Sequence, residues 1–267
     1  MQGRASRPAR ARRRTMDPLD DPAEAGRLKE RILGKASLRK FYEEAYRKYA
    51  ACISGSATPG PALELGSGMG FAKEVIPGIL ATDVLPYPSL DGVIDATRLP
   101  FTEESLGYIF LLDVFHHIPD VGTFLAEAER CLRPGGRILI VDPHPGWISG
   151  PILKYLHHEP FRPGARDWRF ETSGPLTGAN QALAWIVFRR DRRLFESRFP
   201  RLRLRSYHPH SPLRYWLSGG LRRWSLLPGW AFSLATRIDR FLVGISPEFG
   251  SFVDIELEKT GAPASGA

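Results

Sequence analysis

Three glycines at alternate positions follow a short apolar run in the first third of the chain. Residues 62–65 form the run, and Gly66, Gly68 and Gly70 follow it. This pattern is typical of a buried parallel strand that enters a tight turn. Because glycine has no Cβ, the turn can adopt positive φ and let a ligand lie against bare backbone. Glu64 lies inside the run, where a carboxylate is costly to bury unless turn amides or a polar ligand hydrogen-bond to it.

Two acidic residues follow at the ends of the next two expected strands. Asp83 comes after the apolar residues 79–81, at the spacing of about 20 residues at which an acid can accept hydrogen bonds from two ribose hydroxyls. A turn or helix-capping role is the alternative for Asp83. Asp95 ends a third short strand and, taken alone, is an ordinary loop acid.

Two adjacent histidines follow the most apolar segment of this region. Residues 108–114 have the composition of a central buried strand, and His116 and His117 come just beyond its end. Open α/β sheets bind ligands at this edge, and histidine is the most frequent general base. His116 and His117 are therefore candidate catalytic residues. The alternative is that one packs in the turn while the other holds the loop.

Together these features resemble class I S-adenosylmethionine-dependent methyltransferases. The segment Glu64-Leu-Gly-Ser-Gly-Met-Gly70 matches every fixed position of their first motif, and the acids, the His-His pair and Leu-Arg-Pro-Gly-Gly at 132–136 follow in order. The resemblance covers residues 64–143 and is greatest to the small-molecule (type 11) group that includes the ubiquinone and menaquinone enzymes. It implies a Rossmann-like α/β fold, with a seven-stranded, mostly parallel sheet that has helices on both faces.

The resemblance also implies S-adenosylmethionine as the cofactor. The residues expected to bind it are Glu64, Gly66, Ser67, Gly68, Gly70, Asp83, Val84, Asp95, Ala96 and Asp113. Asp95 and Ala96 would lie beside the adenine. One departure from the family pattern is that only residues 71–76 are available for the helix after the glycine turn, before Pro77-Gly78.

The remaining elements are expected around this core. Apolar residues at helical spacing predict a helix over 38–49, which either covers the cofactor or packs on the sheet. A capped helix should start after Asp120. We expect a helix over 191–199 and antiparallel strands over 202–207 and 251–258. The expected domain organisation is a basic tail (1–26), a helical cover (27–53), the cofactor-binding core (54–143), a substrate cap (144–188), the closing helix and strands (189–260) with an aromatic and basic insertion (209–250), and a tail (261–267).

The cap contains the candidate substrate residues. These are His144, Trp147, His157 and His158. His157, His158 and Glu159 are consecutive, so they cannot all face one ion on a regular strand or helix. No metal site is therefore expected.

Composition suggests a cytoplasmic protein with acidic partners. The 267 residues carry a net charge of +8, and two cysteines form no disulfide framework. Part of the charge lies before Met16, in a segment interpreted as a tail or as upstream sequence. Arginines alternate with aromatic residues over 209–250, which suits contact with the inner face of a membrane, closure of an apolar pocket, or a dimer. A nucleic-acid substrate is disfavoured, because no recognisable RNA-binding module is present.

These observations favour an enzyme that transfers a methyl group to a small-molecule, lipid-linked or glycan-linked acceptor. One alternative is an NAD-dependent oxidoreductase. The third glycine argues against it, because this glycine follows the second by two residues rather than three. The other alternative is a non-catalytic protein that keeps the fold and associates with a membrane.

Overall fold

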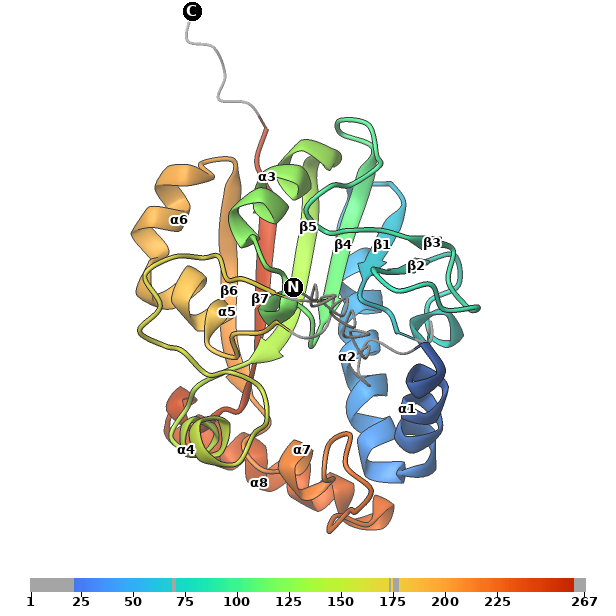
Figure 1. Ribbon diagram of the computed structural model, residues 1–267, viewed down its shortest axis with the longest axis vertical. Coiled ribbons are helices and arrows are strands. Elements are labelled where there is room, and N and C mark those ends of the chain that lie inside the picture. The colour runs from blue at the N-terminus through green and yellow to red at the C-terminus, as the bar shows by residue number, and fades with distance from the viewer. Residues whose placement is uncertain (1–21, 69–70, 173, 175–177, 262–267) are drawn as a thin grey trace, which may run out of the picture.

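The computed structural model describes residues 22–68, 71–172, 174 and 178–261. Within them lies a seven-stranded sheet with strand order β3-β2-β1-β4-β5-β7-β6 (Figure 1). β7 runs antiparallel to both of its neighbours, and the other strand pairs are parallel. The strands are β1 (Ala62–Leu65), β2 (Leu80–Asp83), β3 (Gly92–Val93), β4 (Leu106–Leu112), β5 (Leu132–Pro143), β6 (Leu202–His210) and β7 (Phe252–Lys259). The predicted fold class is confirmed, including the antiparallel closing pair.

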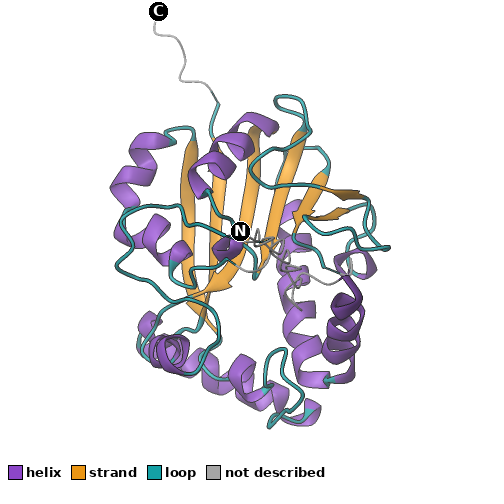
Figure 2. Ribbon diagram, viewed as in Figure 1, coloured by secondary structure: helices purple, strands orange, loops and turns teal. Residues whose placement is uncertain are grey.

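Helices cover both faces of the sheet (Figure 2). β4 is buried along its whole length and sends alternate side chains to two separate cores. Ile109 and Leu111 pack under one layer, and Tyr108 and Phe110 pack under the other. The first layer is built from α3 (Val121–Cys131), α5 (Leu183–Trp185), the π-helical turn η4 (Ile186–Arg190) and α6 (Arg192–Arg198). The second layer contains α1 (Pro22–Gly34) and α2 (Ala36–Ser54), and α7 (Arg214–Leu217) packs against α2 at the end of this layer.

The helix predicted over 38–49 is the central part of α2. Leu38, Phe41 and Tyr49 are buried on one face of α2, as the spacing predicted. Tyr49 stacks on Phe110 of β4, with ring centroids 4.2 Å apart. Burial of such aromatic pairs fixes the helix against the carboxyl half of the sheet. Asp120 caps α3 as predicted, because its carboxylate accepts the N–H of Thr123 at 3.0 Å.

Further helices lie beyond the carboxyl ends of the parallel strands. Figure 1 shows α4, α7 and α8 at this end of the molecule, opposite α3. The segment 209–250 therefore carries helices of its own, as its length suggested. The elements here are α4 (Ser149–Tyr155), η5 (Gly229–Ala231), α8 (Phe232–Ile245) and η6 (Pro247–Phe249), and the short helices η2 (Phe71–Glu74) and η3 (Phe115–His117) follow β1 and β4.

Several element boundaries differ from the sequence prediction. α1 begins at Pro22, inside the segment assigned to the basic tail. Residues 182–188 were assigned to the cap, yet Ile186, Val187 and Phe188 are buried in the core under the sheet. Their apolar side chains continue directly into α6, so they belong to the closing helical layer. β3 ends at Val93, so Asp95 lies two residues beyond the strand rather than at its end.

Candidate cofactor and acceptor site

The glycine turn after β1 is bonded to the end of β2. Gly66 and Gly68 have φ of 70° and 55°, in the left-handed region that favours glycine. The N–H of Gly68 donates to Asp83 Oδ2 at 2.9 Å, and the N–H of Ser67 donates to the carbonyl of Thr82 at 2.8 Å. The predicted proximity of the turn and Asp83 is therefore present in the fold.

The two described glycines of the turn serve different purposes. A Cβ on Gly66 would lie 2.3 Å from Cγ2 of Val114, so this position has no room for a side chain. A Cβ on Gly68 would meet nothing within 4 Å, so it would project into open space. Gly66 allows the turn to pack against Val114, whereas Gly68 leaves bare backbone for a ligand. Gly70 lies outside the described residues.

A cavity of about 430 Å³ opens beside this turn. The residues predicted to bind cofactor all line it where they are described, namely Glu64, Gly66, Ser67, Gly68, Asp83, Val84, Asp95, Ala96 and Asp113. Sequence reasoning missed Ile32, Leu33 and Tyr42, which reach the cavity from α1 and α2. The helical spacing over 38–49 identified the helix of Tyr42 but not the face that meets the cavity.

A buried carboxylate, Glu64, and a half-buried one, Asp113, make this cavity suited to a cation. Burial raises the pKa of Glu64 to about 7, and Glu64 Oε2 has no hydrogen-bond partner among the described residues. Burial also raises the pKa of Asp113 to about 7, and its backbone adopts φ of 59°. A buried carboxylate is stabilised by a positive donor. S-adenosylmethionine carries an ammonium and a sulfonium, so the residues present fit this cofactor.

The two candidate histidines have different surroundings. His116 is fully buried behind the cavity wall, where its Nδ1 donates to Asp142 Oδ1 at 2.9 Å and its Nε2 lies 3.4 Å from Glu159 Oε2. Burial lowers the pKa of His116, but the carboxylates of Asp142 and Glu159 raise it by a larger amount. The pKa of His116 therefore stands well above its usual value. His116 is thus an imidazolium between two acids.

His117 lines the cavity itself. Its Nδ1 donates to the carbonyl of Gly178 at 3.0 Å, so its Nε2 carries the lone pair. This Nε2 lies 3.6 Å from Glu159 Oε1. Burial and the neighbouring His116 charge lower the pKa of His117 to about 4, so the ring is neutral near pH 7. His117 can therefore accept a proton on the side that faces the cavity.

Glu159, which follows the two candidate substrate residues His157 and His158 in the sequence, also lines the cavity. Although burial raises the pKa of Glu159, the hydrogen bond from His116 and the nearby histidines hold it well below its usual range. Gln181 Nε2 also donates to Glu159 Oε2. Glu159 is therefore an ionised carboxylate at the cavity wall.

Two groups of side chains in the described chain have metal-ligand proximity. They are His116, His117 and Glu159, and Asp113, His116 and Asp142, and within each group the ligand atoms lie within 4.8 Å of one another. Both groups need His116, whose two ring nitrogens already face carboxylates. A metal at either position would have to displace one of these contacts.

The four predicted substrate residues do not line the cavity. His144 extends β5 by donating its N–H to the carbonyl of Ser251, and its Nδ1 lies 2.9 Å from the hydroxyl of Tyr207 on β6. It is therefore on the β5-β7-β6 side of the sheet, whereas the glycine turn lies between β1 and β2. Trp147 is exposed and packs on Phe249. His157 and His158 lie next to Glu159, at 4.0 Å and 3.6 Å, but outside the lining.

Residues 79–140 match the family model described as "Methyltransferase domain". This stretch of the chain is a methyltransferase domain. The match runs from β2 through most of β5 and includes the cavity-lining residues Asp83, Asp95 and Asp113. The predicted family is therefore confirmed, and the domain implies S-adenosylmethionine as the cofactor.

Curated relatives match over limited parts of their length. The chain is 44% identical over 59 residues to phthiotriol/phenolphthiotriol dimycocerosates methyltransferase 1 of Mycobacterium ulcerans, covering 22% of each protein. It is 23% identical over 137 residues to demethylmenaquinone methyltransferase of Tropheryma whipplei, covering 44% of this chain and 57% of that protein. The chain thus matches less than two thirds of the length of either relative.

Solved structures share the fold. A chain in the complex of the Haloferax volcanii Trm112 methyltransferase activator with a methyltransferase superposes with a TM-score of 0.50, at 16% identity, over 90% of this chain and 96% of that one. Identity this low establishes the fold alone. In the described ranges, no helix combines the length and apolar character needed to cross a membrane.

Proposed function

We propose that this protein transfers a methyl group from S-adenosylmethionine to a small-molecule or lipid-linked acceptor. The observation that carries the proposal is the bare turn at Gly68, hydrogen-bonded to Asp83 and placed beside the unpartnered Glu64 carboxylate. The names of the two relatives, which describe methyl transfer to phthiotriol-type lipids and to demethylmenaquinone, support a hydrophobic acceptor.

The residues of this chain would divide the work of binding. When bound, S-adenosylmethionine supplies an electrophilic methyl group on its sulfonium. Asp83 would accept hydrogen bonds from the ribose hydroxyls, since its carboxylate is already oriented by the N–H groups of Gly68 and Leu85. Glu64 and Asp113 would hold positive charge, and Asp95 and Ala96 would contact the adenine.

The acceptor side of the cavity would be the part lined by His117 and Glu159. An acceptor hydroxyl becomes a better nucleophile as it loses its proton. Neutral His117 presents an unprotonated Nε2 to the cavity, and Glu159 would stabilise the imidazolium that forms. His116 and Asp142 position Glu159 from behind and do not touch the acceptor.

Calorimetry with S-adenosylmethionine and S-adenosylhomocysteine tests the cofactor part of the proposal. The wild-type protein should bind both compounds, and Asp83→Ala should weaken binding at least tenfold because it removes the ribose acceptor. Asp91→Ala is the matched control, since Asp91 is a nearby acid that does not line the cavity. Absence of affinity at millimolar concentration would reject the proposal.

Transfer of a labelled methyl group to demethylmenaquinone and to phthiotriol tests the acceptor chemistry. If His117 accepts a proton, His117→Asn should lower kcat by about 10²–10⁴ while cofactor affinity is retained. At saturating S-adenosylmethionine, whose positive charges would keep Glu64 and Asp113 ionised, the wild-type rate should hold on acidification until the pH approaches 4, because the pKa of His117 is lowered to about 4. A rate that already halves near pH 6.5 would contradict this role.

Peripheral membrane contact at the inner face, in a cytoplasmic protein, also belongs to the proposal. It is supported by the exposed aromatic and basic residues of segment 209–250. A protein that binds vesicles but methylates no acceptor would instead support the non-catalytic alternative.

A further inference from the structure

Helix α8 turns a polar residue inward and an apolar face outward. Asp239 is buried against the protein, at 2% exposure. Leu234, Ile238, Phe241 and Ile245 are exposed by 44–69% and recur at helical spacing along one side of α8. An amphipathic helix of a water-soluble protein normally has the opposite orientation. The outward face is therefore an apolar surface that the described chain does not cover.

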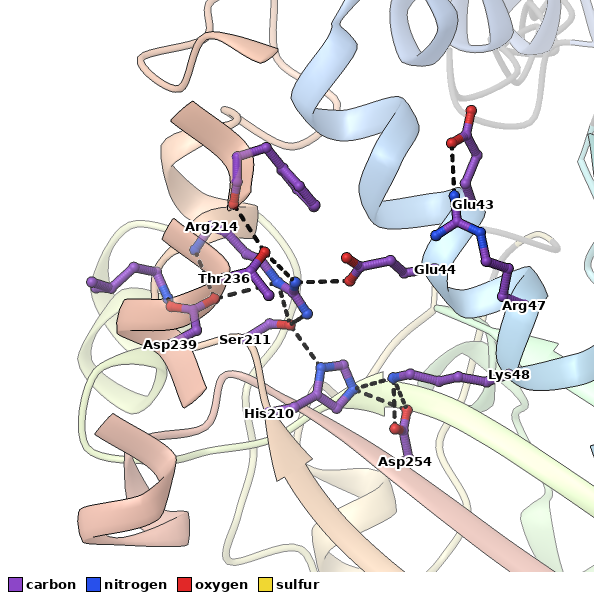
Figure 3. Close-up of polar contacts among 12 residues, drawn as sticks. Glu43, Glu44, Arg47, Lys48, His210, Ser211, Arg214, Thr236, Asp239 and Asp254 are labelled. Carbon is purple, nitrogen blue, oxygen red and sulfur yellow. Dashed lines mark hydrogen bonds and ion pairs between the residues drawn. The ribbon is translucent and has the colours of Figure 1, made fainter. Parts of the chain in front are cut away.

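The inward face of α8 is held by an ionic network (Figure 3). Asp239 Oδ1 accepts the N–H of Leu213 at 2.9 Å, and its Oδ2 lies 3.3 Å from Arg214 Nε. Arg214 Nη1 lies 2.7 Å from Glu44 Oε2 on α2 and donates to Thr236 Oγ1 at 2.9 Å. These directional contacts fix the rotation of α8 about its axis. The network therefore holds the apolar side of α8 toward the outside.

The exposed surface extends beyond α8 into the preceding loop. Leu226 and Trp230 are exposed by 72% and 84%, and Trp224 by 45%. Arginines accompany them, and the exposed ones are Arg222, Arg223, Arg237 and Arg240. On the α8 helix, Arg237 and Arg240 lie on one side of the apolar row. Aliphatic side chains, indoles and guanidiniums in this arrangement match the acyl, interfacial and phosphate layers of a bilayer.

We propose that this surface, the exposed side of residues 222–245, docks on an anionic lipid bilayer. The arginines indicate that an anionic bilayer, rather than a second copy of this chain, binds the surface. Anionic phosphates would neutralise them, whereas a second copy in a symmetric contact would bring like charges together around the apolar row. Leu221 lines the cavity, and the docking surface starts at the next residue. This part of the inference rests on the proposed function: the adjacency would bring a lipid acceptor in the membrane to the entrance of the site.

Vesicle sedimentation tests the docking surface without any activity measurement. Full-length protein should sediment with vesicles of phosphatidylcholine mixed with phosphatidylglycerol and much less with vesicles of phosphatidylcholine alone. Phe241→Glu should lower the partition coefficient by about tenfold or more, because it places a charge in the apolar row. Arg237→Glu and Arg240→Glu should each lower it by about fivefold or more.

Two matched controls separate docking from general surface effects. Leu194→Glu and Arg193→Glu alter an exposed leucine and arginine on α6, away from α8 in Figure 1, and should leave sedimentation unchanged. Equal sedimentation of Phe241→Glu and wild type would overturn the proposal. So would a stable dimer in size-exclusion chromatography that Phe241→Glu converts to a monomer, with no vesicle binding by the wild type. Calorimetry with S-adenosylhomocysteine should be unaffected in Phe241→Glu, so failure of docking and failure of the methyltransferase assignment give different results.

Discussion

Glu64 is a buried carboxylate at the base of the glycine turn. It is 1% exposed, and one of its oxygens lacks a partner in the described chain. Such an arrangement is costly for the empty protein and becomes favourable when a cationic ligand donates to it. The same residue therefore limits the stability of the ligand-free protein and supports binding.

Glu64→Gln should change the pH dependence of stability. Because burial raises the pKa of Glu64 to about 7, the folded protein holds this proton more tightly than the unfolded chain does. That contribution is present below the unfolded pKa and is lost as pH rises through about 7. In urea titrations without ligand, Glu64→Gln should gain about 1–3 kcal/mol relative to wild type between about pH 5 and about pH 8. It should also bind S-adenosylmethionine more weakly. A stability difference that is the same at both pH values would contradict the prediction.

Comparing Gly68→Ala with Gly78→Ala should separate the loss of space for a ligand from the cost of backbone strain. The added Cβ would meet no protein atom within 4 Å and would project into the cofactor space. Gly78 also has positive φ and nothing within 4 Å, but it does not line the cavity. Both Gly68→Ala and Gly78→Ala should cost about 1 kcal/mol of stability. Only Gly68→Ala should weaken S-adenosylhomocysteine binding in calorimetry, by at least tenfold, and equal affinities would show that the turn does not contact the ligand.

At the scale of elements, the connection between α8 and the core depends on charge. Arg214 is nearly buried and joins Asp239 on α8 to Glu44 on α2. Neighbouring contacts among Lys48, His210 and Asp254 attach α2 to β6 and β7 (Figure 3). Removing one member of such a network leaves a buried charge uncompensated.

Arg214→Met should therefore destabilise the protein by about 3–5 kcal/mol in urea unfolding, and it should speed hydrogen exchange in α8. Arg214→Met combined with Asp239→Leu should recover much of this loss, because no buried carboxylate remains on α8. The control is Arg47→Met, which removes a more exposed ion pair between Arg47 and Glu43, both on α2. That change should cost less than about 0.5 kcal/mol. Equal costs for the two single variants would show that the network does not anchor α8.

At the scale of the whole molecule, the candidate site lies at one end of the sheet. The glycine turn, the acids and the two histidines lie at the carboxyl ends of parallel strands, and the helices of segment 209–250 lie beyond them (Figure 1). A ligand in this cavity would contact residues from α1, α2, β1, β2 and the loops after β3 and β4, which all line it. Binding should therefore stabilise the folded chain as one unit.

S-adenosylhomocysteine should raise the thermal unfolding temperature, whereas NAD should not. At about 100 times its dissociation constant, a ligand adds about 2.7 kcal/mol, which corresponds to roughly 5–10 °C for a chain of this size. The glycine spacing and the family match both support the methyl donor over a dinucleotide. Protection by NAD and none by S-adenosylhomocysteine would favour the oxidoreductase alternative.

Within residues 62–143, the sequence by itself determined the strands, the glycine turn and a set of candidate cofactor residues that line the cavity where they are described. These features depend on neighbours close in the chain, because strand patterns, turn chemistry and motif spacing are local properties. Tertiary structure alone decided which histidine reaches the cavity, since His116 and His117 are adjacent in sequence and differ only in the partners that distant segments supply. It also brought Glu159 to the cavity and left the four proposed substrate residues outside it. The outward apolar side of α8 was decided in the same way, because Glu44 and Arg214, far apart in the chain, fix the rotation of that helix through long-range ion pairs that no local pattern encodes.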